Sequence, residues 1–188
     1  LKPLPASHFE ERAARLQSIF VTQLENALAP ARIVNYGSAL GGYGYWFLPY
    51  PVTHLTGPHL SIANTLDKQH NINTVSDAEA FLARVDAYSV AIDGVITAME
   101  QDEAAGVLPP DFIIKKTWGS LERDAQTAKE HTLYNSFTKK IADAGLTEDE
   151  QADLTAQLVT LLDEHYIPAN KRSIAKLKDM EQRADHTA

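Results

Sequence analysis

The sequence lacks several features that whole classes of protein require. It contains no cysteine, which excludes disulfide bonds, cysteine-ligated zinc and a thiol nucleophile. Basic side chains are scarce: 17 lysines and arginines face 25 acidic residues, and the formal net charge of −8 disfavours nucleic acid and anionic lipid as partners. No apolar run approaches the ~18 residues that a membrane span needs, so the sequence predicts none.

The start of the chain also lacks expected features. It opens at Leu1 without an initiator methionine, and its first residues do not form a signal peptide. We therefore expect a processed protein or a fragment of a larger one. The length of 188 residues and the 44% hydrophobic content are typical of an ordinary globular domain, so residues 1–188 are predicted to form a single helical domain.

Motifs for catalysis and metal binding are absent from the sequence. No two of the seven histidines stand four residues apart, so His-Glu-x-x-His and its reverse do not occur. Ser38 lacks a Gly-x-Ser-x-Gly elbow, the Gly42–Gly44 stretch is no dinucleotide fingerprint, and there is no P-loop. His54 and His59 flank a turn and could converge, but no suitably spaced carboxylate joins them. The sequence predicts no catalytic, cofactor-binding or metal-binding residue.

Helix-start signals occur at three places, each with the Ser/Thr-x-x-Glu pattern of a capping box: Ser7–Glu10, Ser76–Glu79 and Thr147–Glu150. The first predicts a helix that ends before Pro30, with an apolar face formed by Phe9, Ala13, Leu16, Phe20 and Leu24. The second predicts a long helix that ends at Gly106, with an apolar seam at alternating spacings of four and three: Phe81, Val85, Tyr88, Ile92, Val95 and Met99.

The length of this second helix limits the possible architectures. From Ser76 to Ala105 it would measure about 45 Å, whereas a compact globule of this size has a diameter of about 40 Å. Either Gly94 bends the helix, or the bundle is elongated. Both alternatives are open at this point.

Three further helices complete the predicted fold. One begins near Pro110 and buries Phe112, Ile113 and Trp118. The next covers about Lys129–Ala144 and buries Leu133, Phe137 and Ile141. The last begins at Thr147 and is interrupted at Pro168, and its inward residues are Leu154, Leu158, Leu161 and Leu162. No convincing strand pattern appears. The sequence predicts an all-α fold, an elongated bundle of about five main helices.

Residues 30–75 differ in composition from the rest and hold five of the nine glycines. We interpret them as a long, ordered, irregular segment with a short helix near His59–Lys68. The segment carries an aromatic cluster, Tyr43, Tyr45, Trp46, Phe47 and Tyr50. Tyrosine and tryptophan concentrate at interfaces and ligand grooves. These side chains either anchor the segment onto the helices or line a groove or domain interface.

The order of several motifs matches a known family. The stretch Ser76–Val85 reads Ser-Asp-Ala-Glu-Ala-Phe-Leu-Ala-Arg-Val, and a long helix and then Ala105–Pro110 follow it. Thr56–Gly57 after the aromatic run, and Tyr166–Ala169 in the last helix, stand in the same order. The chain thereby resembles the bacterial domain-of-unknown-function family 885 over roughly residues 8–182. It departs from the usual pattern at Phe81 and Val85, and at Asn170, where members usually have tyrosine.

The resemblance implies a function that this chain alone does not carry out. Members are large helical proteins thought to be related to zinc metallopeptidases of the gluzincin type, and their His-Glu-x-x-His helix lies downstream of the matched part. The resemblance therefore implies a non-catalytic helical portion of a metallopeptidase-like hydrolase that shapes the substrate cleft and supports the catalytic domain. The resemblance implies that any zinc would be held by the rest of the parent protein, and this remaining polypeptide would be the partner.

The chain alone is predicted to be inactive. The alternative hypothesis is that it is a free-standing helical binding or interaction module of unknown ligand. The resemblance favours an extracytoplasmic location, periplasmic or lipid-anchored. The sequence does not specify substrate or oligomeric state.

Overall fold

The computed structural model describes residues 11–28, 50–124 and 127–186. These residues form seven α-helices: α1 (Glu11–Leu28), α2 (Pro58–Asn64), α3 (Val75–Ala104), α4 (Asp111–Asp124), α5 (Thr132–Asp143), α6 (Glu148–Leu161) and α7 (Ile167–Glu181). Wider π turns follow α2 at Thr65–Gln69 and α6 at Leu162–Tyr166, and a 3₁₀ turn, Ala128–Glu130, precedes α5. No strand occurs in the described ranges, and the predicted all-α class is confirmed.

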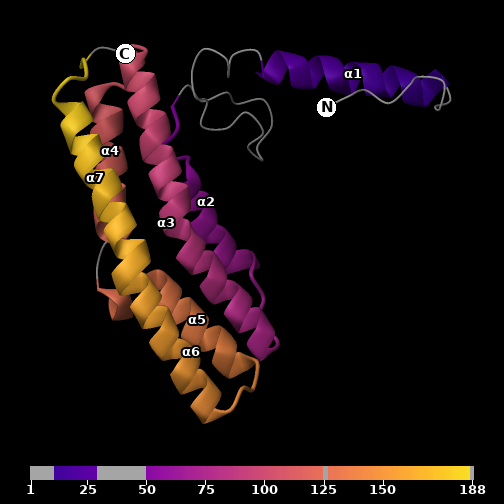
Figure 1. The fold of residues 1–188 in the computed structure, drawn as a ribbon, viewed down its shortest axis with the longest axis vertical. Coiled ribbons are helices and arrows are strands. Elements are labelled where there is room, and N and C mark those ends of the chain that lie inside the picture. The colour runs from indigo at the N-terminus through magenta and orange to yellow at the C-terminus, as the bar shows by residue number, and fades with distance from the viewer. Residues whose placement is uncertain (1–10, 29–49, 125–126, 187–188) are drawn as a thin grey trace.

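The bundle is elongated, and α3 crosses most of its length (Figure 1). This helix contains 30 residues and continues through Gly94 without interruption. All six residues of the predicted apolar seam are buried. The helix ends just before Gly106, whose φ of 78° is the left-handed conformation that commonly terminates helices. Of the two alternatives left open by its length, elongation is the correct one.

The start of α3 differs from the prediction by two residues. Thr74, rather than Ser76, is the N-cap: its hydroxyl accepts a hydrogen bond from the Asp77 N–H at 3.2 Å, and the Asp77 carboxylate accepts from the Thr74 N–H at 3.0 Å. The same carboxylate also accepts from the Asn73 N–H at 3.0 Å. This earlier start thus satisfies several donors with one carboxylate. The predicted box at Thr147–Glu150 is confirmed, and Ser7–Glu10 lies outside the described residues.

The buried face of α4 was predicted wrongly. Phe112 is 36% exposed, Ile113 and Trp118 are half-buried, and the buried residues are instead Ile114, Thr117 and Leu121. Burial of Thr117 is possible because its hydroxyl donates to the Ile113 carbonyl at 2.7 Å, which satisfies the polar group within the helix. The position therefore belongs to the core although its residue type is polar.

The predicted interruption at Pro168 takes the form of a π turn. Leu162–Tyr166 adopts this wider turn immediately before α7, and Pro168 stands in the first turn of α7. Proline has no backbone N–H and clashes with the carbonyl four residues earlier in a regular helix, and the π turn changes this hydrogen-bond pattern. As a result α7 continues roughly in the direction of α6 (Figure 1).

Two hydrophobic clusters fill the bundle along its long axis. One lies mainly among α3, α5, α6 and the π turns and includes the predicted residues Leu133, Phe137 and Ile141. The other joins α3, α4 and α7 and includes Val52 from the segment before α2. Ile96 packs against both clusters. Leu154, Leu158 and Leu162 are buried as predicted, whereas Leu161 is only half-buried.

Buried aromatic and polar contacts connect α3 to the α6–α7 region. The rings of Tyr88 and Tyr166 are stacked, with centroids 3.7 Å apart and planes at 13°. The Tyr88 hydroxyl donates to the Asn170 side-chain carbonyl at 2.6 Å, in a buried position. Asn170, the residue that departs from the usual family pattern, is therefore a hydrogen-bond partner inside this core.

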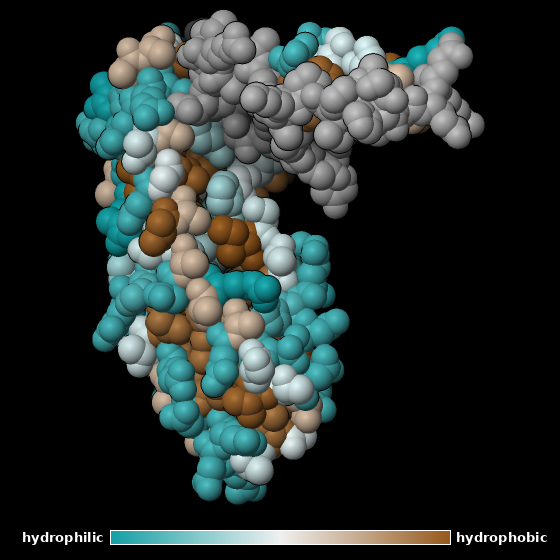
Figure 2. Space-filling view, turned by 45° about the vertical axis from the view of Figure 1, so that its right-hand side comes forward, coloured by the Kyte–Doolittle hydropathy of each residue, from teal (hydrophilic) through white to brown (hydrophobic). Residues whose placement is uncertain are grey.

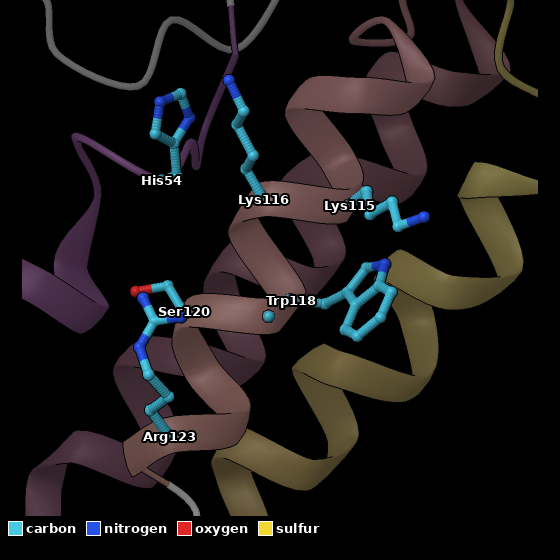
Figure 3. Close-up of a pocket in the computed structure, with 7 residues that line it drawn as sticks. His54, Lys115, Lys116, Trp118, Ser120 and Arg123 are labelled. Carbon is cyan, nitrogen blue, oxygen red and sulfur yellow. The ribbon is translucent and has the colours of Figure 1, made fainter.

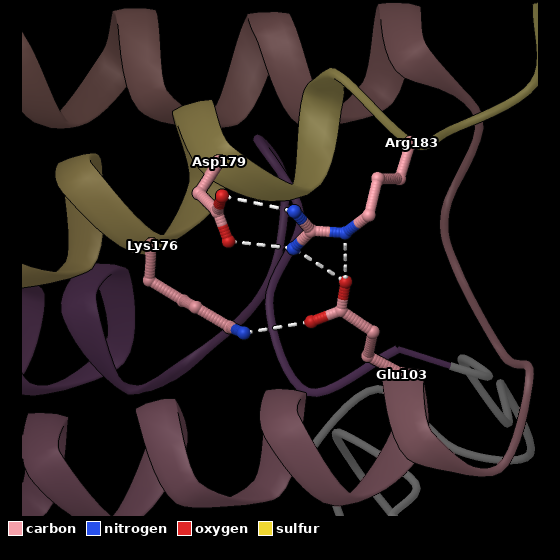
Figure 4. Close-up of polar contacts among 4 residues, drawn as sticks. All are labelled: Glu103, Lys176, Asp179 and Arg183. Atoms are coloured by element: carbon pink, nitrogen blue, oxygen red, sulfur yellow. Dashed lines mark hydrogen bonds and ion pairs between the residues drawn. The ribbon is translucent and has the colours of Figure 1, made fainter.

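Glu103, in the last turn of α3, is not an ordinary solvated residue. Its side chain is only 19% exposed and pairs with Lys176 at 2.7 Å and with Arg183 at 2.6 Å. Arg183 also forms two hydrogen bonds with Asp179 (Figure 4). The hydrogen bond from Lys176 is the main cause that lowers the pKa of Glu103. This network fastens the end of α3 to the end of α7.

Helix α1 lies apart from the other helices (Figure 1). None of the side chains described on it is buried, and three large apolar ones on one face are exposed: Leu16 (49%), Ile19 (57%) and Phe20 (66%). Figure 2 shows hydrophobic residues on α1 and at several places along the surface of the bundle. The predicted apolar face of this helix thus exists but is not packed against the bundle, and Phe9 lies outside the described residues.

Candidate functional site

A tight turn before α2 positions two histidines. The Thr53 hydroxyl accepts hydrogen bonds from the N–H groups of Leu55 and Thr56, both at 3.1 Å, and the Thr53 N–H donates to the Thr56 carbonyl at 2.8 Å. Such local bonds from threonine favour turns. The turn places His54 on one side, while His59 follows in the first turn of α2.

His59 is a buried imidazole. It is 3% exposed, and neither ring nitrogen has a hydrogen-bond partner among the described residues. Burial disfavours the charged form and lowers the pKa of His59 to about 4. Gly57 is required beside it: at φ 134°, a Cβ would lie 2.9 Å from both His59 Nδ1 and Val52 Cγ1. His59 is therefore neutral at physiological pH and tightly enclosed.

An open groove of about 490 Å³ lies beside His54 on the outer side of α4. The other lining side chains all come from α4 and include Lys115, Lys116, Trp118, Ser120 and Arg123. Figure 3 shows Lys116 and His54 extending from neighbouring elements, with Arg123 on the same side of α4 and Trp118 directed toward α7. The Trp118 indole N–H donates to the Glu181 carboxylate at 2.6 Å, which fixes that end of the groove.

The charge of this groove is opposite to that of the chain. Lys115, Lys116 and Arg123 make no ion pair and no hydrogen bond with another described residue. Two acidic residues of α4 with described side chains have other partners: Glu122 pairs with Lys178 at 2.6 Å and Asp111 with His186 at 2.9 Å. The charge of Lys115 adds a smaller contribution to the lowered pKa of Asp111, whose main cause is the hydrogen bond from His186. The groove is therefore a local cationic site suited to an anionic group, and it offers no nucleophile–base pair.

The residues singled out in the sequence are only partly brought together. Tyr43, Tyr45, Trp46 and Phe47 lie outside the described residues, and Tyr50 is half-buried where the described segment resumes. His165 Nδ1 pairs with Asp86 of α3 at 2.5 Å, while Asp163 and Glu164 are exposed. These three consecutive residues therefore form no relay, because neighbouring positions on a helix point in different directions.

The described residues do not provide a zinc site. Among them, no three His, Asp or Glu side chains come close enough to hold a metal ion. A catalytic zinc needs three protein ligands. His54 and His59 thus fall short of a ligand set.

The groove on α4 is not evident from the sequence. The feature of the sequence that could have indicated it is the pair Lys115–Lys116, with Arg123 seven residues after Lys116, in an otherwise acidic chain. Such a run is usually a solvated helix face. This run differs from an ordinary solvated face because the turn before α2 places His54 beside it, and that placement is seen only in the tertiary structure.

The fold and surface described so far define an all-α helical domain without a recognisable catalytic centre in its described residues. The chain belongs to the family "Bacterial protein of unknown function (DUF885)", whose model matches residues 5–188. A search of curated proteins found no match. Within the described residues, no helix is both long and apolar enough to cross a membrane.

A solved structure shares this fold. It is described as "the putative lipoprotein from Colwellia psychrerythraea" and is 20% identical, with a TM-score of 0.72. The match covers 78% of this chain and 26% of the other. This chain thus spans about a quarter of the length of that structure.

Proposed function

We propose that this chain is a non-catalytic helical portion of a larger zinc-dependent hydrolase related to metallopeptidases. In that protein it would form one wall of the substrate cleft and support the catalytic domain. The observation that carries the proposal is the exposed apolar face of α1, formed by Leu16, Ile19 and Phe20, which packs against no helix of the bundle among the described residues. A helix face of this kind needs an apolar partner, and exposed apolar patches mark interaction sites.

Two further observations support the proposal. The fold corresponds to about a quarter of a longer chain of known structure, which leaves most of such a protein to supply a catalytic domain. The description of that structure as a lipoprotein supports an extracytoplasmic location, periplasmic or lipid-anchored. Zinc would be held outside the residues described, because these bring no ligand set together.

A second function, a free-standing binding module, is favoured by one observation. The cationic groove on α4 has the unpaired charges that a binding site for an anion needs. The two functions are compatible within one larger protein. They differ in what the apolar face of α1 contacts.

The face of α1 provides the experiment that tests the proposal. The rest of the parent protein is expressed separately, and its binding to this chain is measured by calorimetry. Phe20→Asp should weaken binding at least about tenfold, because exposed aromatic residues at interfaces contribute strongly to affinity. Phe20 is 66% exposed, so the substitution should leave the helical circular dichroism unchanged.

Val90→Asp is the matched control, since Val90 is an exposed apolar residue (76%) on α3. It should leave binding unchanged. Equal binding by the Phe20→Asp variant and the unsubstituted chain, or equal losses in both variants, would contradict a specific role for α1.

A further inference from the structure

We propose that the groove between His54 and α4 binds an acidic peptide, with Lys116 and Arg123 holding its carboxylates. The site is independent of the proposed hydrolase function, because it uses only side chains of this chain. Its test likewise needs no catalytic domain.

The first argument is the distribution of unpaired cations. Five described lysines and arginines form no ion pair or hydrogen bond with described residues: Lys115, Lys116, Arg123, Lys129 and Lys171. Three of the five line this one groove. Most other described cations have partners, as Lys176 and Arg183 have in Glu103. In a chain with a net charge of −8, cations gathered without carboxylates favour an anion from outside.

The second argument is the arrangement of the side chains. Lys116, Ser120 and Arg123 stand at i, i+4 and i+7, which places them on one face of α4. The rise from Lys116 to Arg123 is about 10 Å, the length of about three residues of extended peptide. Arginine and lysine both form charge-assisted hydrogen bonds with carboxylates, and arginine does so in bidentate fashion.

His54 adds an unused hydrogen-bonding atom beside these cations. Its Nδ1 is buried and has no partner among the described residues. Buried polar atoms without a partner are rare in folded proteins. Because this nitrogen is enclosed, a peptide backbone group or carboxylate reaches it only if the His54 ring turns toward the groove. The Ser120 hydroxyl offers a neutral contact between the two cations.

The chemistry of the site favours peptide carboxylates over phosphate or nucleic acid. Phosphate sites commonly use backbone N–H groups at helix starts and in nests, whereas this groove lies along the side of α4. A long polyanion would also be repelled by the net charge of −8. A short acidic peptide brings few charges and also has a backbone to contact the Trp118 side of the groove.

The experiment measures fluorescence anisotropy of labelled hexaglutamate with the full chain, with hexaglutamine as the neutral probe. The double variant Lys116→Gln/Arg123→Gln should weaken hexaglutamate binding at least about tenfold, because two charge-assisted contacts are lost. The matched control, Lys129→Gln/Lys171→Gln, removes the same charge from unpaired lysines outside the groove and should change binding less than about twofold.

A third variant tests the location without removing a cation. A Cβ at Gly119 would meet no atom within 4 Å, so this lining position has room for a side chain, and Gly119→Glu adds a carboxylate to the groove. It should also abolish most binding. Circular dichroism confirms that each variant is folded.

The outcomes separate the alternatives. Selective loss in the groove variants supports the proposal. Absence of hexaglutamate binding, equal binding of hexaglutamine, or equal losses in both double variants would overturn it. Displacement of the peptide by inorganic phosphate, at an ionic strength matched with chloride, would assign the groove to a small inorganic anion instead and would also overturn it.

Discussion

Replacing Ile92 with alanine is expected to lower the free energy of unfolding by about 2–5 kcal/mol, through lost burial and the cavity left behind. Ile92 is 1% exposed and belongs to the apolar seam of α3. It lies in the larger hydrophobic cluster, which also contains Tyr88 and Tyr166. Because these large side chains are fully buried, the cavity cannot be filled by a small movement of a surface residue.

Chemical denaturation measures the effect, with Val90→Ala as the control on the same helix. Val90 is 76% exposed, so its truncation should change the free energy of unfolding by no more than about 0.5 kcal/mol. Equal effects of the two substitutions would mean that the buried face of α3 is assigned wrongly.

The second large effect is a loss of stability at mildly acidic pH caused by His59. Burial lowers its pKa to about 4 in the folded protein, against an ordinary value of 6.5. The unfolded chain therefore binds a proton between these values and the folded chain does not, so stability is present above pH 6.5 and declines as the pH falls toward 4. The loss attributable to His59 should be about 2 kcal/mol between pH 7.5 and pH 5.

The His59→Leu variant isolates this contribution. Leucine cannot be protonated, and it replaces an imidazole that has no hydrogen-bond partner among the described residues. Urea denaturation of both proteins at the two pH values should show a smaller decline for the variant, by about 2 kcal/mol. Parallel declines would show that His59 does not titrate as a buried neutral group.

Helix faces that form an unbroken row of apolar residues could be predicted from the sequence. The seam of α3 and the row Leu133, Phe137 and Ile141 of α5 repeat at helical spacing, and the structure buries every one of them. In these helices the residue type alone identifies the face, because nothing polar interrupts the pattern.

The buried face of α4 could not be predicted in this way. Its core positions are Ile114, Thr117 and Leu121, and the middle one is polar. The Thr117 hydroxyl finds its partner within the helix, so its burial costs little and leaves no trace in the hydrophobic pattern. The apolar Phe112, which the pattern favoured, is partly exposed instead.

Features that depend on contacts between distant segments could likewise not be predicted from the sequence. Glu103 is charged and lies near the end of α3, but Lys176 of α7 and Arg183 just after α7 enclose it. The groove depends on His54 lying beside α4, although more than 50 residues separate them in the chain. Spacing along the sequence carries no information about such pairs.

A calorimetric titration of this chain with zinc tests whether it is the non-catalytic portion of a hydrolase. A hydrolytic zinc site needs several ligands in fixed geometry, and the described residues bring no such set together. If the chain is the non-catalytic portion of a hydrolase, it should bind zinc only as weakly as scattered surface histidines do. Tight binding of one zinc ion per chain would contradict this and would place a metal centre within these 188 residues.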